Sequence, residues 1–289
     1  MDNDPMATRK TAAKKAEESK ALTTPSQGGA LALPFDYGEM AGEGMENMTS
    51  ADQAVPFIRI LQALSPEVAK KDKKVEGAAP GKFIDSVSSE MHDEIIFVPC
   101  LTEHLFVEWR PRNQGGGFVG RHDLRSGVDR NAKRNEKGKL ILPNGNELVE
   151  TFYVAAMTLD APDAEHPSGF VMLSFVSSGI QPYKKSIGEL RKIPGAPLFG
   201  FILRATTDEQ SNSEGTWYNW VIRPVNQPEG DPVFRNGILA SVIDPSGPQA
   251  GLLEVARTFK DDVMAGQANI AYDSQGEGAA DKGSDDQVF

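Results

Sequence analysis

The segment Glu94–Trp109, with the sequence EIIFVPCLTEHLFVEW, decides the fold class of this chain. Its first part, Glu94–Leu101, is rich in β-branched and aromatic residues, and its second part, His104–Trp109, alternates apolar with polar residues. Both patterns are typical of β-strands, which bury side chains in short runs or on alternate sides. We therefore expect two neighbouring strands here, within a β-rich fold.

More strands are expected on both sides of this segment. The Asn144-Gly145 pair between Lys139–Leu142 and Leu148–Met157 predicts a β-hairpin. The other expected strands are Val55–Leu64, Phe83–Val87, Gly169–Ser177, Phe199–Thr206 and Thr216–Pro224, with a polar loop over Asp208–Gly215. Many short strands with glycine and proline turns favour an all-β barrel or sandwich, and the spacing leaves these two open. A barrel of five or six strands with long insertions fits the pattern.

Only two segments have helical patterns. Gly251–Ala265 places its apolar residues at i, i+3 and i+4 spacing, which predicts an amphipathic helix. Tyr183–Ile193 is shorter and ends at Pro194-Gly195. The few helices predict an all-β chain in which residues 51–265 form a single β-barrel domain. Residues 1–50 and 266–289 are poor in strand-forming residues, so both are expected to be disordered tails.

Charge is separated along the chain. The formal net charge is −11, and the segment from Asp261 to the end carries seven acids and one base. Residues 105–140 instead carry nine bases and four acids. An acidic total therefore coexists with a basic segment, which is the part suited to a polyanion.

Several classes of protein are disfavoured. Cys100 is the single cysteine, which excludes an internal disulfide and a cysteine-based zinc site and suits a reducing cytoplasm. No apolar run reaches transmembrane length and no secretory signal is found. The four histidines are scattered, and no hydrolase, kinase or dinucleotide motif is present. We expect a non-enzymatic protein without cofactor or metal, although a metal-dependent nuclease stays open as a minor alternative.

A first candidate binding segment follows the second expected strand. It contains Trp109, Arg110, Arg112, Phe118 and Arg121, with the three glycines 115–117 between the second arginine and the phenylalanine. Single-stranded nucleic acid needs rings for base stacking and cations about one nucleotide away for phosphates. The alternative is that Trp109 and Phe118 are core residues and the glycines a plain linker.

Two further segments combine cations with rings. One is the predicted short helix with Tyr183, Lys184, Lys185, Arg191 and Lys192, whose alternative interpretation is a solvated helix face. The other is the strand with Trp217, Tyr218 and Trp220, flanked by Arg204. Neighbouring strand residues point to opposite sides, so one side of this strand is expected to present a ring outside the core. Burial under a loop is the alternative.

The chain ends in Asp285-Asp286-Gln287-Val288-Phe289. Phe289 offers a ring for a small pocket and the terminal carboxylate for a basic rim, and Asp285 and Asp286 add attraction to a positive surface. We expect these three residues to bind a partner, the alternative being a passive disordered end.

Together these residues resemble phage single-stranded DNA-binding proteins, which are small OB-fold proteins with an acidic tail ending in phenylalanine. The likeness rests on Asp285–Phe289 and more loosely on Phe57–Ile60, Glu108–Gly120 and Trp217–Trp220. The resemblance implies an OB-fold-like barrel that coats single-stranded DNA in phage replication, recombination or repair. It also implies that the tail recruits a phage DNA polymerase, helicase or primase in the host cytoplasm. Whether the protein forms homo-oligomers stays open. The alternative is a phage structural or adaptor protein that binds other proteins.

Overall fold

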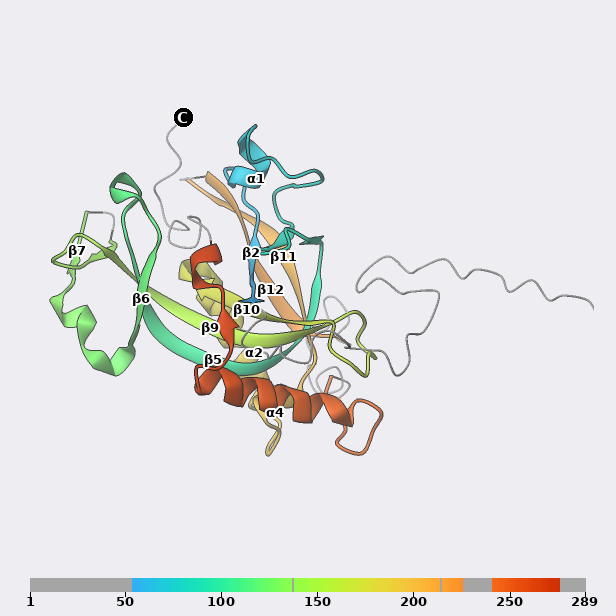
Figure 1. The fold of residues 1–289 in the computed structure, drawn as a ribbon. Helices are drawn as coiled ribbons and strands as arrows, with labels where there is room; N and C mark the ends of the chain where they lie inside the picture. Colours follow the sequence, from blue (N-terminus) through green and yellow to red (C-terminus); the bar gives the residue numbers. More distant parts are fainter. Residues whose placement is uncertain (1–53, 137, 214, 226–240, 276–289) are drawn as a thin grey trace, which may run out of the picture.

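The chain folds around one large, strongly curled β-sheet (Figure 1). The computed structural model describes residues 54–136, 138–213, 215–225 and 241–275. The strand order is β12-β11-β5-β9-β10-β2-β3-β4, and β6, β7 and β8 join the sheet off this path through β5 and β9. The predicted β-rich class is therefore confirmed, and the sheet has the shape of a half-barrel. The two tails predicted to be disordered lie outside the described residues, apart from 266–275.

The longest strands are β5 (Ile95–Trp109) and β9 (Glu147–Leu159), which pair antiparallel along almost their whole length. The prediction of two strands in Glu94–Trp109 is wrong in one respect, because they are one continuous strand. The register shifts between Pro99 and Leu101. Such a bulge bends a strand and increases its twist without ending it.

Some of the remaining strands match predicted ones, whereas β4, β6, β7 and β13 were not predicted and β11 runs past its predicted end at Thr206. Their bounds are β1 (Ala54–Val55), β2 (Phe57–Ile60), β3 (Phe83–Asp85), β4 (Met91–His92), β6 (Phe118–Asp123), β7 (Lys133–Arg134), β8 (Leu140–Ile141), β10 (Gly169–Val176), β11 (Leu203–Asn212), β12 (Gly215–Pro224) and β13 (Asn269–Ile270). The Asn144-Gly145 turn is confirmed, and Gly145 has φ 86°, which suits glycine. The predicted loop Asp208–Gly215 is wrong, because β11 and β12 pair through Asn212 and Gly215.

Two hydrophobic layers cover the two faces of the sheet. One contains Val98, Val107, Tyr153 and Met172 and is covered by α4 (Ala250–Met264), whose Leu252, Ala256, Phe259 and Val263 are buried. The other contains Phe97, Phe152, Leu173 and Phe175 and is covered by α2 (Ile180–Leu190). Both predicted helices are confirmed within one to three residues at each end. A short α1 (Pro66–Ala69) follows β2. Among the described residues, no helix is long and apolar enough to cross a membrane.

Two side chains bridge the open side of the half-barrel, and one of them, Thr207 of β11, donates from Oγ1 to the Gly81 main-chain oxygen at 2.7 Å. Gln62 follows β2, and its Nε2 donates to the main-chain oxygen of Tyr218 at 2.9 Å while its Oε1 accepts from the Tyr218 main-chain nitrogen at 2.8 Å. This amide satisfies the same two main-chain groups that a further strand would satisfy. It therefore protects the edge of β12, which pairs with β11 on its other side.

The last described residues cross the α4-covered face as a strap, which we define as Asn269–Gln275. In it, β13 pairs parallel with β1, and Ser274 Oγ lies 2.7 Å from Ser86 Oγ. Gln275 is buried, and its Oε1 accepts a hydrogen bond of 2.7 Å from the Tyr153 hydroxyl. The strap thus ties the C-terminal end of the folded region to its first strand.

The bridge makes a stability prediction. Gln62→Leu leaves two main-chain groups of Tyr218 without this partner, so we expect a loss of about 1–3 kcal/mol in the free energy of unfolding. Urea unfolding checks it, with Gln267→Leu on the exposed chain after α4 as the matched control. Equal stability of the two variants would mean that Gln62 does not stabilise the edge of β12.

Candidate nucleic-acid interface

The basic segment found in the sequence folds into a separate extension of the sheet. We define the basic arm as residues 103–150, which comprise the distal parts of β5 and β9 with β6, β7 and β8. In Figure 1 the β6 and β7 hairpins extend to one side of the sheet, away from α4. The arm's exposed cations are Arg110, Arg112, Arg121, Arg125, Arg130, Lys133 and Arg134. Lys137 lies outside the described residues.

The glycines at 115–117 form a compact turn at the end of the arm. All three have positive φ, and the Arg110 main-chain nitrogen donates to the Gly117 oxygen at 2.9 Å. η3 (Arg112–Gln114) stands inside the same turn. The glycines are therefore neither a plain linker nor a flexible loop, because they join β5 directly to β6.

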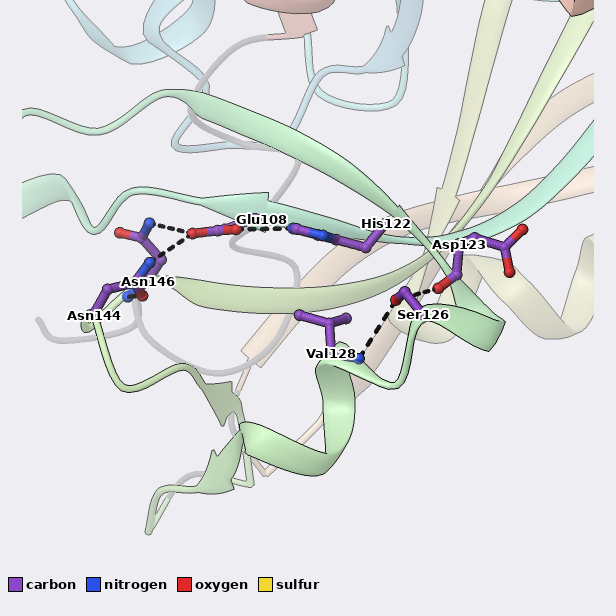
Figure 2. A network of polar contacts seen from close by, with 7 residues as sticks. All are labelled: Glu108, His122, Asp123, Ser126, Val128, Asn144 and Asn146. Atoms are coloured by element: carbon purple, nitrogen blue, oxygen red, sulfur yellow. Dashed lines mark hydrogen bonds and ion pairs between the residues drawn. The ribbon is translucent and has the colours of Figure 1, made fainter.

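A buried carboxylate holds the inner side of the arm together. Glu108 Oε2 accepts from His122 Nε2 at 2.8 Å, and Oε1 accepts from Asn144 Nδ2 at 2.9 Å and from Asn146 Nδ2. Figure 2 shows Glu108 between His122 of β6 and the two asparagines of the β8–β9 turn. One side chain thus joins three segments of the arm.

The hydrogen bonds decide the ionisation of this group. Burial by itself raises the pKa of the Glu108 carboxyl, but the hydrogen bonds from Asn146, Asn144 and His122 together lower the pKa below its ordinary value. The carboxylate is therefore ionised at neutral pH, and its charge is directed to partners inside the arm. This network was not predicted, because Phe118–Asp123 has no alternation of apolar and polar residues in sequence that would indicate the strand positioning His122; only its burial alternates.

On the other side of the arm, two of the predicted binding residues pack against the strap. The Phe118 ring is stacked on the Tyr272 ring at 5.1 Å, and the Arg121 guanidinium carbon lies 4.6 Å from the centre of the same ring. Arg121 Nη1 also donates to Glu103 at 3.1 Å. Phe118 is half-buried by these contacts, whereas Arg121 keeps an exposed side chain.

Three predicted stacking residues are core residues. Trp109, Tyr183 and Trp220 are 5%, 1% and 3% exposed. Trp109 lies in the layer under α4, and the other two lie in the layer under α2. Their assignment to base stacking is corrected, because a base cannot reach a ring that is packed inside the folded chain. The core alternative was right for Trp109, and Phe118 packs against the same layer while staying half-buried.

The cations of the α2 segment form a second surface. Lys184, Lys185, Arg191 and Lys192 are exposed. Lys184 Nζ lies 4.9 Å from the centre of the Phe152 ring, which belongs to the layer under α2. Phe118, in contrast, packs against the layer under α4. Lys184 and Arg121 therefore lie on opposite faces of the sheet, although Lys184 also pairs with Glu150 of the arm at 3.9 Å.

The predicted aromatic strand is β12. Tyr218 packs against the layer under α2, and its hydroxyl donates to Glu209 at 2.8 Å. Trp217 is half-buried, and its Nε1 has no hydrogen-bond partner among the described residues. Arg204 on β11 pairs with Glu94 at 3.6 Å. Trp217 is thus the tryptophan of this strand that keeps some exposure.

The predicted partner-binding residues Asp285, Asp286 and Phe289 lie outside the described residues. Within the described residues, no group of three histidine, cysteine, aspartate or glutamate side chains is placed to hold a metal ion.

Comparison with known proteins gives one family. The family described as Pam3 phage gp34-like protein matches residues 26–268. The chain belongs to this family. The match spans the arm, α2 and α4 and ends just before the strap. No curated protein and no solved structure gives a significant match to the chain.

Because two of its three tryptophans are buried, the response of the protein's tryptophan fluorescence to acrylamide can be predicted. We expect Trp217→Phe to remove most of the quenching by acrylamide, because Trp217 is the least buried of the three. Trp109→Phe and Trp220→Phe should leave the accessible fraction nearly unchanged. Strong quenching that persists in Trp217→Phe would contradict the buried positions.

The Glu108 network predicts a pH-dependent stability. Its folded-state pKa is lowered, so its contribution is present above the ordinary carboxyl value of 4.5 and is lost as the pH falls through the lowered value. We expect Glu108→Gln to cost about 1–3 kcal/mol at pH 7 and less towards pH 3. Urea unfolding across this range measures the difference, with exposed Glu136→Gln as the control. A difference that does not change with pH would contradict this role of the carboxylate.

Proposed function

We propose that this chain is a non-catalytic phage protein that binds single-stranded DNA, with the basic arm as the phosphate-contacting surface. The single observation that carries the proposal is the gathering of exposed cations on the arm, although the whole chain has a net charge of −11. Its role would be to coat transient single strands in replication, recombination or repair, in the cytoplasm of the host cell.

The arrangement of charge on the arm supports this proposal. The carboxylate of Glu108 is buried and bonded to His122 and two asparagines, and Lys139 pairs with Glu147 at 3.3 Å in the arm. Asp123 accepts from the main-chain nitrogen of Arg125, at the start of η4 (Leu124–Ser126). These three acids are engaged in local contacts, while Asp129, Glu136 and Glu150 stay exposed, so the arm keeps a modest positive surplus of nine Lys and Arg over seven Asp and Glu.

Base stacking is expected to contribute less to the affinity for DNA than phosphate contacts do. Among the described rings that the sequence singled out, Phe118, Trp217 and Tyr218 keep partial exposure, and all three already contact neighbours or lie half-buried. Binding through phosphates alone carries no base information. The affinity should therefore depend strongly on salt and weakly on sequence.

The acidic tail would supply the second half of the proposed function. Asp285, Asp286 and Phe289 would recruit a phage DNA polymerase, helicase or primase. The strap ends at Gln275, and its Tyr272 contacts Phe118 and Arg121 of the arm. A tail that starts beside the arm has a high effective concentration there, so it would compete with DNA for the cations.

A second candidate is a phage adaptor or structural protein that binds other proteins. The observation that favours it is the burial of Trp109, Tyr183 and Trp220, which removes three of the rings that strand coating would use. Phosphate binding weakens steeply with salt through counterion release, whereas a protein interface of ordinary polarity does not.

Labelled oligo-dT titrated at two salt concentrations tests the leading proposal. We expect the triple variant Arg125→Ala, Arg130→Ala and Lys133→Ala to bind more weakly. The slope of log affinity against log salt should become shallower by about 2, since each lost phosphate contact on a single strand removes about 0.7.

The matched control removes three exposed lysines from the body of the protein, Lys70, Lys71 and Lys74. This variant has the same change in net charge and should keep nearly the parental slope. Equal loss in both variants would assign binding to total charge, and no binding by the parent protein would leave the adaptor proposal.

A further inference from the structure

A small cavity lies where β2 separates from β10. The two strands pair in parallel at Phe57 with Met172 and at Ile58 with Leu173. In the described chain this pairing goes no further, although β2 continues to Ile60 and β10 to Val176. A cavity of about 40 Å³ occupies the resulting fork. Its lining comes from both hydrophobic layers, and it includes Arg59, Ser65, Ser174, Trp220 and Gln275.

Two hydrogen-bond donors in this lining have no partner. Gln275 is 2% exposed, and while its Oε1 accepts from Tyr153, its Nε2 is unpaired among the described residues. Arg59 pairs with Glu67 through Nη1, at 3.2 Å, and Nη2, while its buried Nε is also unpaired within the described chain. Buried donors of this kind almost always have an acceptor in a folded protein.

The size and chemistry of the cavity restrict the occupant. A volume of about 40 Å³ holds roughly two or three waters, which is the scale of one small polar group. Its unpaired donors come from two different elements, β2 and the strap, and the hydroxyl-bearing residues Ser65 and Ser174 line the same cavity. A planar group with two oxygen acceptors can accept from two separate donors.

The charge of the site selects among such groups. The Glu67 carboxylate compensates the charge of Arg59. Burial raises the pKa of the Glu67 carboxyl, but the hydrogen bond from Arg59 outweighs this effect and the pKa is lowered, so Glu67 stays ionised. No further charged side chain lines the cavity in the described chain. The Arg59–Glu67 pair leaves the site close to neutral, so every added negative charge is costly, and a group with one charge costs less to bury here than a doubly charged phosphate.

We propose that this cavity is a binding site for a carboxylate group, held by Arg59 Nε and Gln275 Nε2. The site lies between the layers of the body, and it is built from residues other than the cations of the basic arm. Its existence does not depend on DNA binding.

Calorimetric titration of the full chain with sodium acetate tests the proposal, with sodium chloride at equal ionic strength as the reference. We expect a saturable site with a dissociation constant on the order of millimolar, as suits a ligand of four heavy atoms. Gln275→Glu keeps an acceptor for the Tyr153 hydroxyl and replaces the donor by a carboxylate. This variant should weaken acetate binding about tenfold or more.

Gln267→Glu supplies the matched control, because it adds the same charge at an exposed position outside the cavity. Parental affinity in this variant and loss in Gln275→Glu support the site. Absence of saturable acetate binding, equal binding in Gln275→Glu, or tighter binding of phosphate than of acetate would each overturn the proposal.

A second titration identifies the source of the carboxylate. The full chain with Glu277→Gln, Asp281→Asn, Asp285→Asn and Asp286→Asn is titrated in the same way. Tighter acetate binding to this variant assigns the site to acidic side chains of the same chain, and unchanged binding assigns it to an external carboxylate.

Discussion

The pairing of β5 with β9 is the interaction on which the rest of the structure depends. It runs from Ile96 opposite Leu159 to Trp109 opposite Glu147. At one end this strand pair, which we call the ribbon, lies at the centre of the sheet with β11 and β10 as neighbours, and we call this part the body. At its other end the ribbon carries β6 and β8 of the basic arm. Body and arm therefore share the same two strands. The orientation of the arm is set by strand twist and by the bulge after Pro99, without a linker that would let it swing.

This construction explains how an acidic chain can present a basic surface. The ribbon separates the arm from the body, and within the arm the carboxylate of Glu108 is turned inward to His122, Asn144 and Asn146. The same construction separates the cations of α2 from those around Phe118, because a sheet has two faces. A ligand that touches both sets would have to pass around an edge of the sheet. The arm alone is therefore the simpler candidate for one continuous contact with a ligand.

The sequence predicts the body of this fold better than its site. Strand patterns located β5, β9, β10 and β12, and the spacing of Leu252, Ala256 and Phe259 located α4, because burial leaves a periodic signal in one segment. The arm was harder to predict, since β6 is half-exposed and follows a triple glycine that is typical of loops. Ring burial was harder still. Trp109, Tyr183 and Trp220 have neighbouring cations in sequence, but whether a ring is buried depends on elements more than 40 residues away, such as Phe175 against Trp220.

The parallel pair of β1 with β13 places Ala54 beside Asn269. These residues are more than 200 positions apart in sequence, so the pair forms only after Ile270 has left the ribosome. Contacts of such large sequence separation form slowly, since most of the loop entropy must be lost first. A nascent chain that stops before the strap exposes Phe57 and Tyr153 on the face that Tyr272 covers. Synthesis of the strap, rather than folding of the first strands, therefore decides when this apolar face is withdrawn from water and from chaperones.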